Sequence, residues 1–263
     1  MPSIDTGNAP QGAAFSGRIA LVTGAGSGIG RAAAEAFAGR GASVAVVNRN
    51  AERGRDTTAA IRAAGGTAEF FQADMAQPKE IDAMMGAVLA HFGRLDFAFN
   101  NAGVSLPAPG FLQHSLADWN ETIAVNLSSV FLCMQHEIRA MLQTGAGVII
   151  NNGSGASMMG AQGLAHYTAA KHGVMGLMKV AAKEFASRNI RINTVCPGVI
   201  DTAPMHAFVD GMGSAGDAFL RSLPHGRMGT PDDIARVVIW LCSDDAAYVS
   251  GATLVADGGL MCF

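Results

Sequence analysis

Short, continuous apolar segments alternate with longer helical segments along almost the whole chain. The apolar segments lack the polar/apolar alternation of a strand with one face in water. They are therefore expected to be strands covered by helices on both faces. Strands that alternate with helices pair in parallel through right-handed crossovers. The sequence thus predicts an α/β fold built on one doubly wound parallel sheet of the Rossmann type.

The expected strands are residues 18–22, 43–47, 68–72, 95–99, 148–151, 190–195 and 253–255. The expected helices are residues 31–39, 51–64, 80–92, 119–142, 167–187 and 232–241. No repeat or linker divides the chain, so we expect residues 16–263 to form one domain. Residues 1–15 are rich in Gly, Pro and Asn and are expected to be a mobile tail.

The composition excludes several classes of protein. Hydrophobic residues make up 49% of the chain, which excludes a disordered protein. A net charge of −3 gives no basic surface for nucleic acid or an anionic membrane. No apolar run approaches the ~18 residues of a membrane span, and the N-terminus does not resemble a signal peptide. We therefore expect a cytoplasmic protein with no membrane or nucleic-acid partner.

The cysteines show neither a disulfide framework nor a metal motif. Cys133, Cys196, Cys242 and Cys262 share no C-x-x-C or metal-ligand spacing, so they are expected to be free thiols. No pattern of His and carboxylate residues suggests a metal site either. The sequence predicts no bound metal.

A glycine-rich segment, T-G-A-G-S-G-I-G at residues 23–30, joins the first expected strand to the first expected helix. Glycines let backbone N–H groups approach a pyrophosphate, and the helix N-terminus attracts its negative charge. A tight strand–helix connection without a ligand is the alternative interpretation. The place after the first strand of a parallel sheet favours nucleotide binding.

Tyr167 and Lys171 are spaced to lie on one face of a helix. Such a pair alone is more often a solvated surface, but it follows Ser154, 13 residues before Tyr167 at the end of the fifth expected strand. A nearby ammonium is expected to lower the pKa of a phenol, which can then exchange a proton with a carbonyl/alcohol pair. A serine hydroxyl at that strand end can hydrogen-bond the reacting oxygen.

From Phe15 to Gly259 the chain resembles the short-chain dehydrogenases/reductases. The landmarks that carry the resemblance are residues 23–30, Asp74, Asn100-Asn101-Ala102-Gly103, Trp119 through Asn126, Ser154, Tyr167-x-x-x-Lys171, Pro197-Gly198 with Thr202, and Asp257-Gly258-Gly259. Their order and spacing make coincidence implausible. Gly153 departs from the family pattern, which commonly has a second Ser there, and this suggests a roomier pocket wall.

The resemblance implies roles for individual residues. Tyr167 corresponds to the general acid/base, Lys171 to its partner that also holds the nicotinamide ribose, and Ser154 to the residue that stabilises the carbonyl oxygen. Asn126 is similar to the family's fourth catalytic residue, which kinks its helix and seats a water. The implied cofactor contacts are Gly24, Ser27, Gly28, Ile29, Gly30, Asp74, Met75, Asn100, Ala102, Gly103, Tyr167, Lys171, Pro197, Gly198, Ile200 and Thr202.

The end of the second strand distinguishes the two nicotinamide cofactors. An acidic residue there binds the free ribose 2′-OH, whereas a basic one binds a 2′-phosphate. This chain has Asn48 and Arg49, with no carboxylate to repel phosphate. NADP(H) is therefore favoured and NAD(H) stays open, since Arg49 is alternatively a solvated loop charge.

The substrate is expected to be an apolar or alicyclic ketone or secondary alcohol. Residues 202–225 resemble the family's mobile substrate lid, and Met205, Phe208 and Phe219 within them are apolar. His166 and His206 are expected to be surface residues. The alternatives are a catalytically silent nucleotide-sensing regulator, which normally lacks Tyr, Lys or Ser, and a sugar-nucleotide epimerase, which needs a longer region after Gly198.

The expected helix around residues 168–185 is apolar around most of its girth. Charged residues also make up only 15% of the chain, against roughly 25% in ordinary globular proteins. Both features suggest a buried subunit interface. The family resemblance implies helix-to-helix dimers, usually paired into homotetramers.

Overall fold

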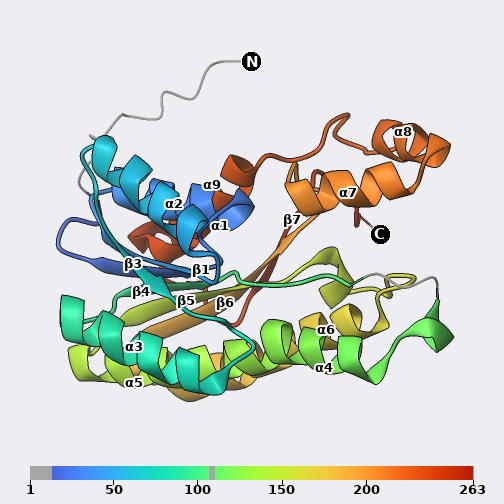
Figure 1. Ribbon diagram of the computed structural model, residues 1–263. Helices are drawn as coiled ribbons and strands as arrows, with labels where there is room; N and C mark the ends of the chain where they lie inside the picture. Colours follow the sequence, from blue (N-terminus) through green and yellow to red (C-terminus); the bar gives the residue numbers. More distant parts are fainter. Residues whose placement is uncertain (1–13, 107–109, 263) are drawn as a thin grey trace.

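The computed structural model describes residues 14–106 and 110–262, and it contains a seven-stranded sheet in the order β3-β2-β1-β4-β5-β6-β7 (Figure 1). All neighbouring strands are parallel. The strands are β1 (Ile19–Thr23), β2 (Ser43–Asn48), β3 (Thr67–Gln72), β4 (Phe97–Asn100), β5 (Gly147–Asn152), β6 (Ile190–Pro197) and β7 (Thr253–Ala256). The strand order reverses between β1 and β4, which is where an open α/β sheet binds its ligand.

Helices cover both faces of the sheet, with α1, α2 and α9 on one face and α3 to α6 on the other (Figure 1). Their bounds are α1 (Gly28–Gly39), α2 (Ala51–Ala63), α3 (Pro78–Phe92), α4 (Leu116–Ile123), α5 (Ser129–Thr144), α6 (Ala165–Phe185), α7 (Ala203–Gly211), α8 (Ser214–Arg221) and α9 (Pro231–Cys242). The predicted doubly wound parallel sheet is confirmed.

Alternate residues of each inner strand enter two separate hydrophobic cores. Leu21 of β1 belongs to the core under α3, α5 and α6, whereas Ala20 and Val22 belong to the core under α1 and α9. Each of these three side chains is fully buried. Burial on both faces explains why the strands read as continuous apolar runs.

The predicted single helix over residues 119–142 is interrupted. A π-helical turn at Ala124–Ser128 separates α4 from α5. Within that turn, Asn126 Nδ2 donates to the Thr122 carbonyl at 3.0 Å and to the Val104 carbonyl at 2.8 Å. An amide bound to both its own helix and a neighbouring loop favours the wider turn, because π-bulges accommodate such insertions into the helical ladder.

The first described residues belong to the expected N-terminal tail. Residues 1–13 of the expected tail lie outside the described residues, but Phe15 is buried and its ring centroid lies 4.7 Å from that of Phe97. Phe15 therefore belongs to the core.

The expected lid at 202–225 contains α7 and α8, which project away from the sheet on the same side as the C-terminus (Figure 1). Within the described residues, no helix is long and apolar enough to cross a membrane.

Candidate active site

The glycine-rich segment forms the turn between β1 and α1. Gly24 has a φ of 65°, and a Cβ there would lie 2.9 Å from the Ala102 Cα. A Cβ at Gly30 would lie 2.3 Å from the Gly24 carbonyl oxygen. The turn therefore packs backbone against backbone, and only glycine fits at these two positions.

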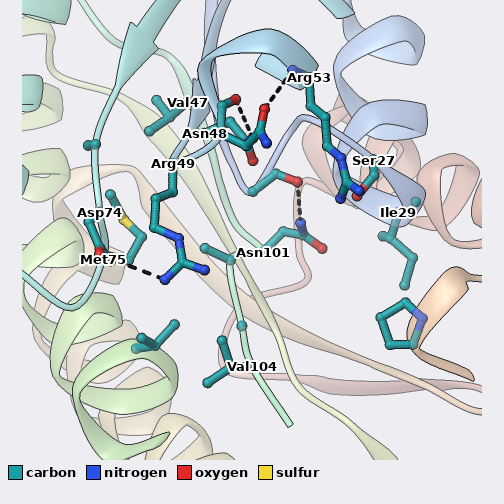
Figure 2. A pocket seen from close by; sticks show the side chains of 18 of the residues that line it. Ser27, Ile29, Val47, Asn48, Arg49, Arg53, Asp74, Met75, Asn101 and Val104 are labelled. Atoms are coloured by element: carbon teal, nitrogen blue, oxygen red, sulfur yellow. Dashed lines mark hydrogen bonds and ion pairs between the residues drawn. The ribbon is translucent and has the colours of Figure 1, made fainter. Parts of the chain in front are cut away.

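A cavity of about 370 Å³ opens at the carboxyl ends of the strands, beside this turn (Figure 2). Predicted cofactor residues that line it are Gly24, Ser27, Gly28, Ile29, Asn48, Arg49, Asp74, Met75, Ala102, Gly103 and Thr202. Further lining residues, which are not among the predicted cofactor contacts, include Asn50, Arg53, Asn101, Val104 and Pro204. The cavity, the glycine cradle and the α1 N-terminus fit a dinucleotide.

Asn100, a predicted cofactor residue, is not among the residues that line the cavity. Its side chain is buried beneath it, where Nδ2 donates to Glu137 Oε2 and to Asn151 Oδ1, both at 3.0 Å. Asn101 lines the cavity instead and donates from Nδ2 to the Thr23 carbonyl at 3.0 Å. Successive side chains in an extended segment point in opposite directions, so only one residue of the Asn-Asn pair can face the cavity.

Six other predicted cofactor residues do not line this cavity: Gly30, Tyr167, Lys171, Pro197, Gly198 and Ile200. Ile200 is buried in the core. At Gly198, a Cβ would lie 2.7 Å from the Asp257 Cα. Pro197, Gly198 and Ile200 shape the backbone next to Thr202, which does reach the cavity.

Two arginines enter the cavity near the end of β2. Figure 2 shows Arg49 reaching toward Asp74 and Arg53 reaching toward Ser27. Arg49 Nη1 lies 3.8 Å from Asp74 Oδ2. No carboxylate stands at the end of β2 itself, but β3 is its neighbour and brings Asp74 alongside Arg49. Arg53, in the first turn of α2, adds a second positive charge that the strand-end rule does not identify.

Ser154, Tyr167 and Lys171 come together at the end of β5 and the start of α6. The Ser154 hydroxyl interacts with the Tyr167 phenol and partly opposes the burial that raises the pKa of Tyr167. Lys171 Nζ lies 5.5 Å from the Tyr167 ring centroid and donates to the Asn152 carbonyl at 2.7 Å. Asn152 Nδ2 donates in turn to Asn101 Oδ1 at 3.0 Å, which connects this group to the cavity wall.

The electrostatics of this group differ from the sequence-based expectation. Burial raises the pKa of Tyr167 and outweighs the opposing effect of Ser154. Burial also lowers the pKa of Lys171 to about 8, so its ammonium releases a proton more easily than an exposed lysine does. The predicted lowering of the phenol pKa by Lys171 does not appear in this arrangement of side chains.

Ser154 is held by a short buried turn. Its N–H donates to Ser157 Oγ at 3.1 Å, and its own Oγ accepts from the Ala156 N–H at 3.2 Å. Behind it, a Cβ at Gly153 would lie 2.6 Å from Cys196 Sγ. The missing side chain at Gly153 therefore does not enlarge the pocket wall, because Cys196 already fills that space.

The two histidines expected on the surface have different positions. His206 is exposed, and its Nε2 lies 2.6 Å from Asp201 Oδ1. His166 is fully buried next to Tyr167, contrary to the expectation.

Among the residues that the structure describes, no group of three His, Cys, Asp or Glu could hold a metal ion.

A Rossmann-type sheet with a cavity at its glycine turn, beside a Ser–Tyr–Lys group, defines a class of nicotinamide-dependent oxidoreductases. A family model described as enoyl-(acyl carrier protein) reductase matches residues 24–261. A cyclohexanol dehydrogenase from Acinetobacter sp. (strain SE19) is 41% identical over 244 residues, which cover 93% of this chain and 95% of the relative.

A second relative and a solved structure are also similar to this chain over almost its whole length. A D-threitol dehydrogenase from Mycolicibacterium smegmatis is 42% identical and covers 92% of each chain. A candidate NAD(P)-dependent gluconate 5-dehydrogenase from Beutenbergia cavernae, solved with NADP at low occupancy, superposes with a TM-score of 0.89 at 36% identity, covering 95% of this chain and 99% of that one.

The chain belongs to the short-chain dehydrogenase/reductase family. It is an NAD(P)-dependent oxidoreductase that acts on CH–OH and C=O groups.

Proposed function

We propose that this protein interconverts an apolar or alicyclic ketone and its secondary alcohol, with Tyr167 as general acid/base. The observation that carries the proposal is the convergence of the Ser154 hydroxyl, the Tyr167 phenol and the buried Lys171 ammonium at one strand end. Asn101 and Asn152 join this group to the cavity that fits the cofactor. Gly24, Ser27, Gly28 and Thr202 are proposed to hold that cofactor.

In the reductive direction, the Tyr167 phenol donates its proton to the carbonyl oxygen of the substrate. The Ser154 hydroxyl donates a hydrogen bond to the same oxygen and holds it against the phenol. The Lys171 ammonium lies over the Tyr167 ring and is proposed to hold the nicotinamide ribose when the cofactor is bound. Asn126 is proposed to seat a water that resupplies the proton. When bound, the nicotinamide supplies the hydride.

NADP(H) is the cofactor that we favour. Arg49 and Arg53 both reach the cavity, and an arginine fork pairs well with a phosphate. Asp74 partly neutralises Arg49, so the preference rests on both arginines. Asn48 presents no charge that would repel a 2′-phosphate, and its Nδ2 is occupied by the Asn50 carbonyl at 2.8 Å.

Exposed apolar residues that follow Ser154 in the chain, and apolar residues on the expected lid, support the proposed substrate class. Met158 and Met159, four and five residues after Ser154, are each 45% exposed. On the lid, the Phe208 and Phe219 rings pack edge to face with centroids 6.2 Å apart. The cyclohexanol dehydrogenase relative is consistent with a ring-shaped substrate, whereas the threitol dehydrogenase relative indicates an open-chain polyol as the second candidate.

A panel of cyclic ketones, open-chain ketones and polyols, assayed by nicotinamide absorbance with each cofactor, tests the proposal. We expect the highest kcat/KM for cyclic substrates with NADP(H). Preference for a polyol would overturn the substrate class. A Tyr167→Phe variant as active as the unmodified enzyme would overturn the catalytic role of Tyr167.

A further inference from the structure

Helix α6, which carries Tyr167, begins without an ordinary capping residue. The residue at its N-cap position is Leu164, whose side chain cannot accept a hydrogen bond. Two histidine rings take this role instead. The Ala165 N–H donates to His114 Nε2 at 3.3 Å, and the Tyr167 N–H donates to His166 Nδ1 at 2.7 Å.

These two hydrogen bonds determine the protonation state of both rings. A ring nitrogen that accepts from a backbone N–H must carry a lone pair, so neither ring can be an imidazolium. His166 must carry its proton on Nε2, and His114 must carry its proton on Nδ1. A second proton on either ring would place an N–H donor against a backbone N–H donor.

The surroundings of the two rings also oppose a positive charge. His166 is fully buried, and the ring centroids of His114 and His166 lie 4.3 Å apart. His114 Nδ1 is buried and has no hydrogen-bond partner within the described part of the chain. Two imidazolium cations at this separation would repel each other, and both would lie at the positive end of the α6 dipole.

Burial and the neighbouring His114 lower the pKa of His166. The Leu106 carbonyl raises the pKa of His166, and so does Asp118 on α4, but burial and His114 outweigh both. On its own helix, Lys171 lies one turn further along with its ammonium directed to the Asn152 carbonyl. The ring of His166 is thus stable as a neutral acceptor near neutral pH.

We propose that His114 and His166 are positioning residues for Tyr167, and that protonation of His166 at acid pH uncaps α6 and displaces the phenol from Ser154. The inference rests on the proposed catalytic role of Tyr167. Because the pKa of His166 is lowered on folding, the stabilising contribution is present above the unfolded value of about 6.5 and is lost as the pH falls through the folded value.

Conservative amides provide a direct kinetic test. Asn Oδ1 stands where His Nδ1 does, and Gln Oε1 reaches about as far as His Nε2, yet neither amide titrates. We expect kcat of the unmodified enzyme to fall below about pH 6.5 while the Kd for the cofactor stays constant. The double variant His114→Gln/His166→Asn should keep kcat within about threefold at pH 8 and lose most of the acid decline.

His136→Gln is the matched control, because His136 is a solvent-facing histidine paired with Asp82 at 2.8 Å and lies away from α6's first turn. Its pH profile should follow that of the unmodified enzyme. His166→Ala, which removes the acceptor, should lower kcat at every pH. A double variant whose acid decline coincides with that of the unmodified enzyme would overturn the proposal.

Nitrogen-15 NMR of the histidine rings gives a readout that does not depend on activity. At about pH 7.5 we expect His166 as the Nε2–H tautomer and His114 as the Nδ1–H tautomer, with signals assigned from the single variants. Finding either ring protonated, or in the opposite tautomer, would overturn the proposal. These tautomers would stand even if no ketone or alcohol were turned over, so this result separates the capping pair from the proposed function.

Discussion

Tyr167 is the residue on which the proposed chemistry depends most directly. Replacing it with Phe removes the phenolic proton but keeps the ring that packs beneath Lys171. We expect kcat to fall by ~10²–10⁴-fold, the usual loss when a general acid–base is removed. Cofactor binding, measured by fluorescence titration, should persist because the glycine turn lies on other elements. Retention of half the original turnover would contradict the assigned role.

Arg49 and Arg53 are the residues expected to distinguish the two cofactors. Arg49→Ala and Arg53→Ala should each weaken NADP(H) relative to NAD(H), because only NADP(H) carries the 2′-phosphate. A charge-assisted contact is worth roughly 1.5–3 kcal/mol, or ten- to a hundredfold in affinity. Arg49 is 66% exposed and lies near Asp74, so the lower figure applies to it.

The measurement is the ratio of kcat/KM for the two cofactors in each variant. Arg31→Ala is the control, since Arg31 pairs with Glu35 on α1 and does not line the cavity. An unmodified enzyme that prefers NAD(H) tenfold would show that neither arginine acts on a phosphate.

At the scale of elements, α5 and α6 together leave an apolar surface exposed. A groove of about 410 Å³ runs between them, lined by Phe131, Met134, Gln135, Ile138, Arg139, Leu142, Gly176, Leu177, Val180, Ala181, Glu184 and Phe185. Val180 is 59% exposed and Phe131 is 44% exposed. An apolar surface of this extent usually marks a protein interface, so we expect a second copy of the chain to cover it.

Val180→Glu should break that interface, because it places a carboxylate in the groove one turn from Glu184. Light scattering at micromolar concentration should give a dimer or tetramer for the unmodified protein and a smaller species for the variant. Lys79→Glu, an exposed change on α3, is the control and should leave the mass unchanged. A monomeric mass for the unmodified protein would rule out the interface.

At the scale of the whole molecule, Glu137 is a fully buried acid that connects α5 to the ends of β4 and β5 through Asn100 and Asn151. Burial raises its pKa to about 8, against the opposing hydrogen bond from Asn100. Glu137 Oε1 and Asn100 Oδ1 are both buried acceptors that have no hydrogen-bond partner among the residues that the structure describes. A proton on Glu137 supplies a donor to this cluster, whereas the ionised form supplies none.

This acid should make the stability of the whole fold depend on pH. The folded pKa of Glu137 lies above the unfolded value of 4.5, so the contribution of Glu137 to stability is greatest in acid and is lost as the pH rises toward about 8. The loss is up to about 1.4 kcal/mol per pH unit in that range. Glu137→Gln, which is permanently neutral, should lack this slope.

Urea unfolding of both proteins between about pH 5 and 9 measures the difference in the free energy of unfolding. The free energy of unfolding of Glu137→Gln, relative to that of the unmodified protein, should increase as the pH rises. Glu35→Gln, at an exposed position on α1, is the control and should run parallel to the unmodified protein. Parallel curves for Glu137→Gln would show that the buried carboxyl does not titrate on this scale.

The sequence alone determined the fold, the glycine turn and the Ser154, Tyr167 and Lys171 group. Strand burial, helix periodicity and turn chemistry are local properties, and each can be read within a few residues. The pattern of residues 119–142 predicted one helix, whereas the structure has a π-helical turn at Asn126. That turn depends in part on the hydrogen bond from Asn126 to the Val104 carbonyl, which lies in another loop.

Only the tertiary structure decided how side chains from distant segments meet. It placed Asp74 beside Arg49, turned Asn100 toward Glu137 rather than the cavity, and filled the space behind Gly153 with Cys196. It also buried His166 against His114 at the start of the helix that carries Tyr167. These contacts depend on strand order, register and side-chain direction, which bring together residues whose separation along the chain carries no local signal.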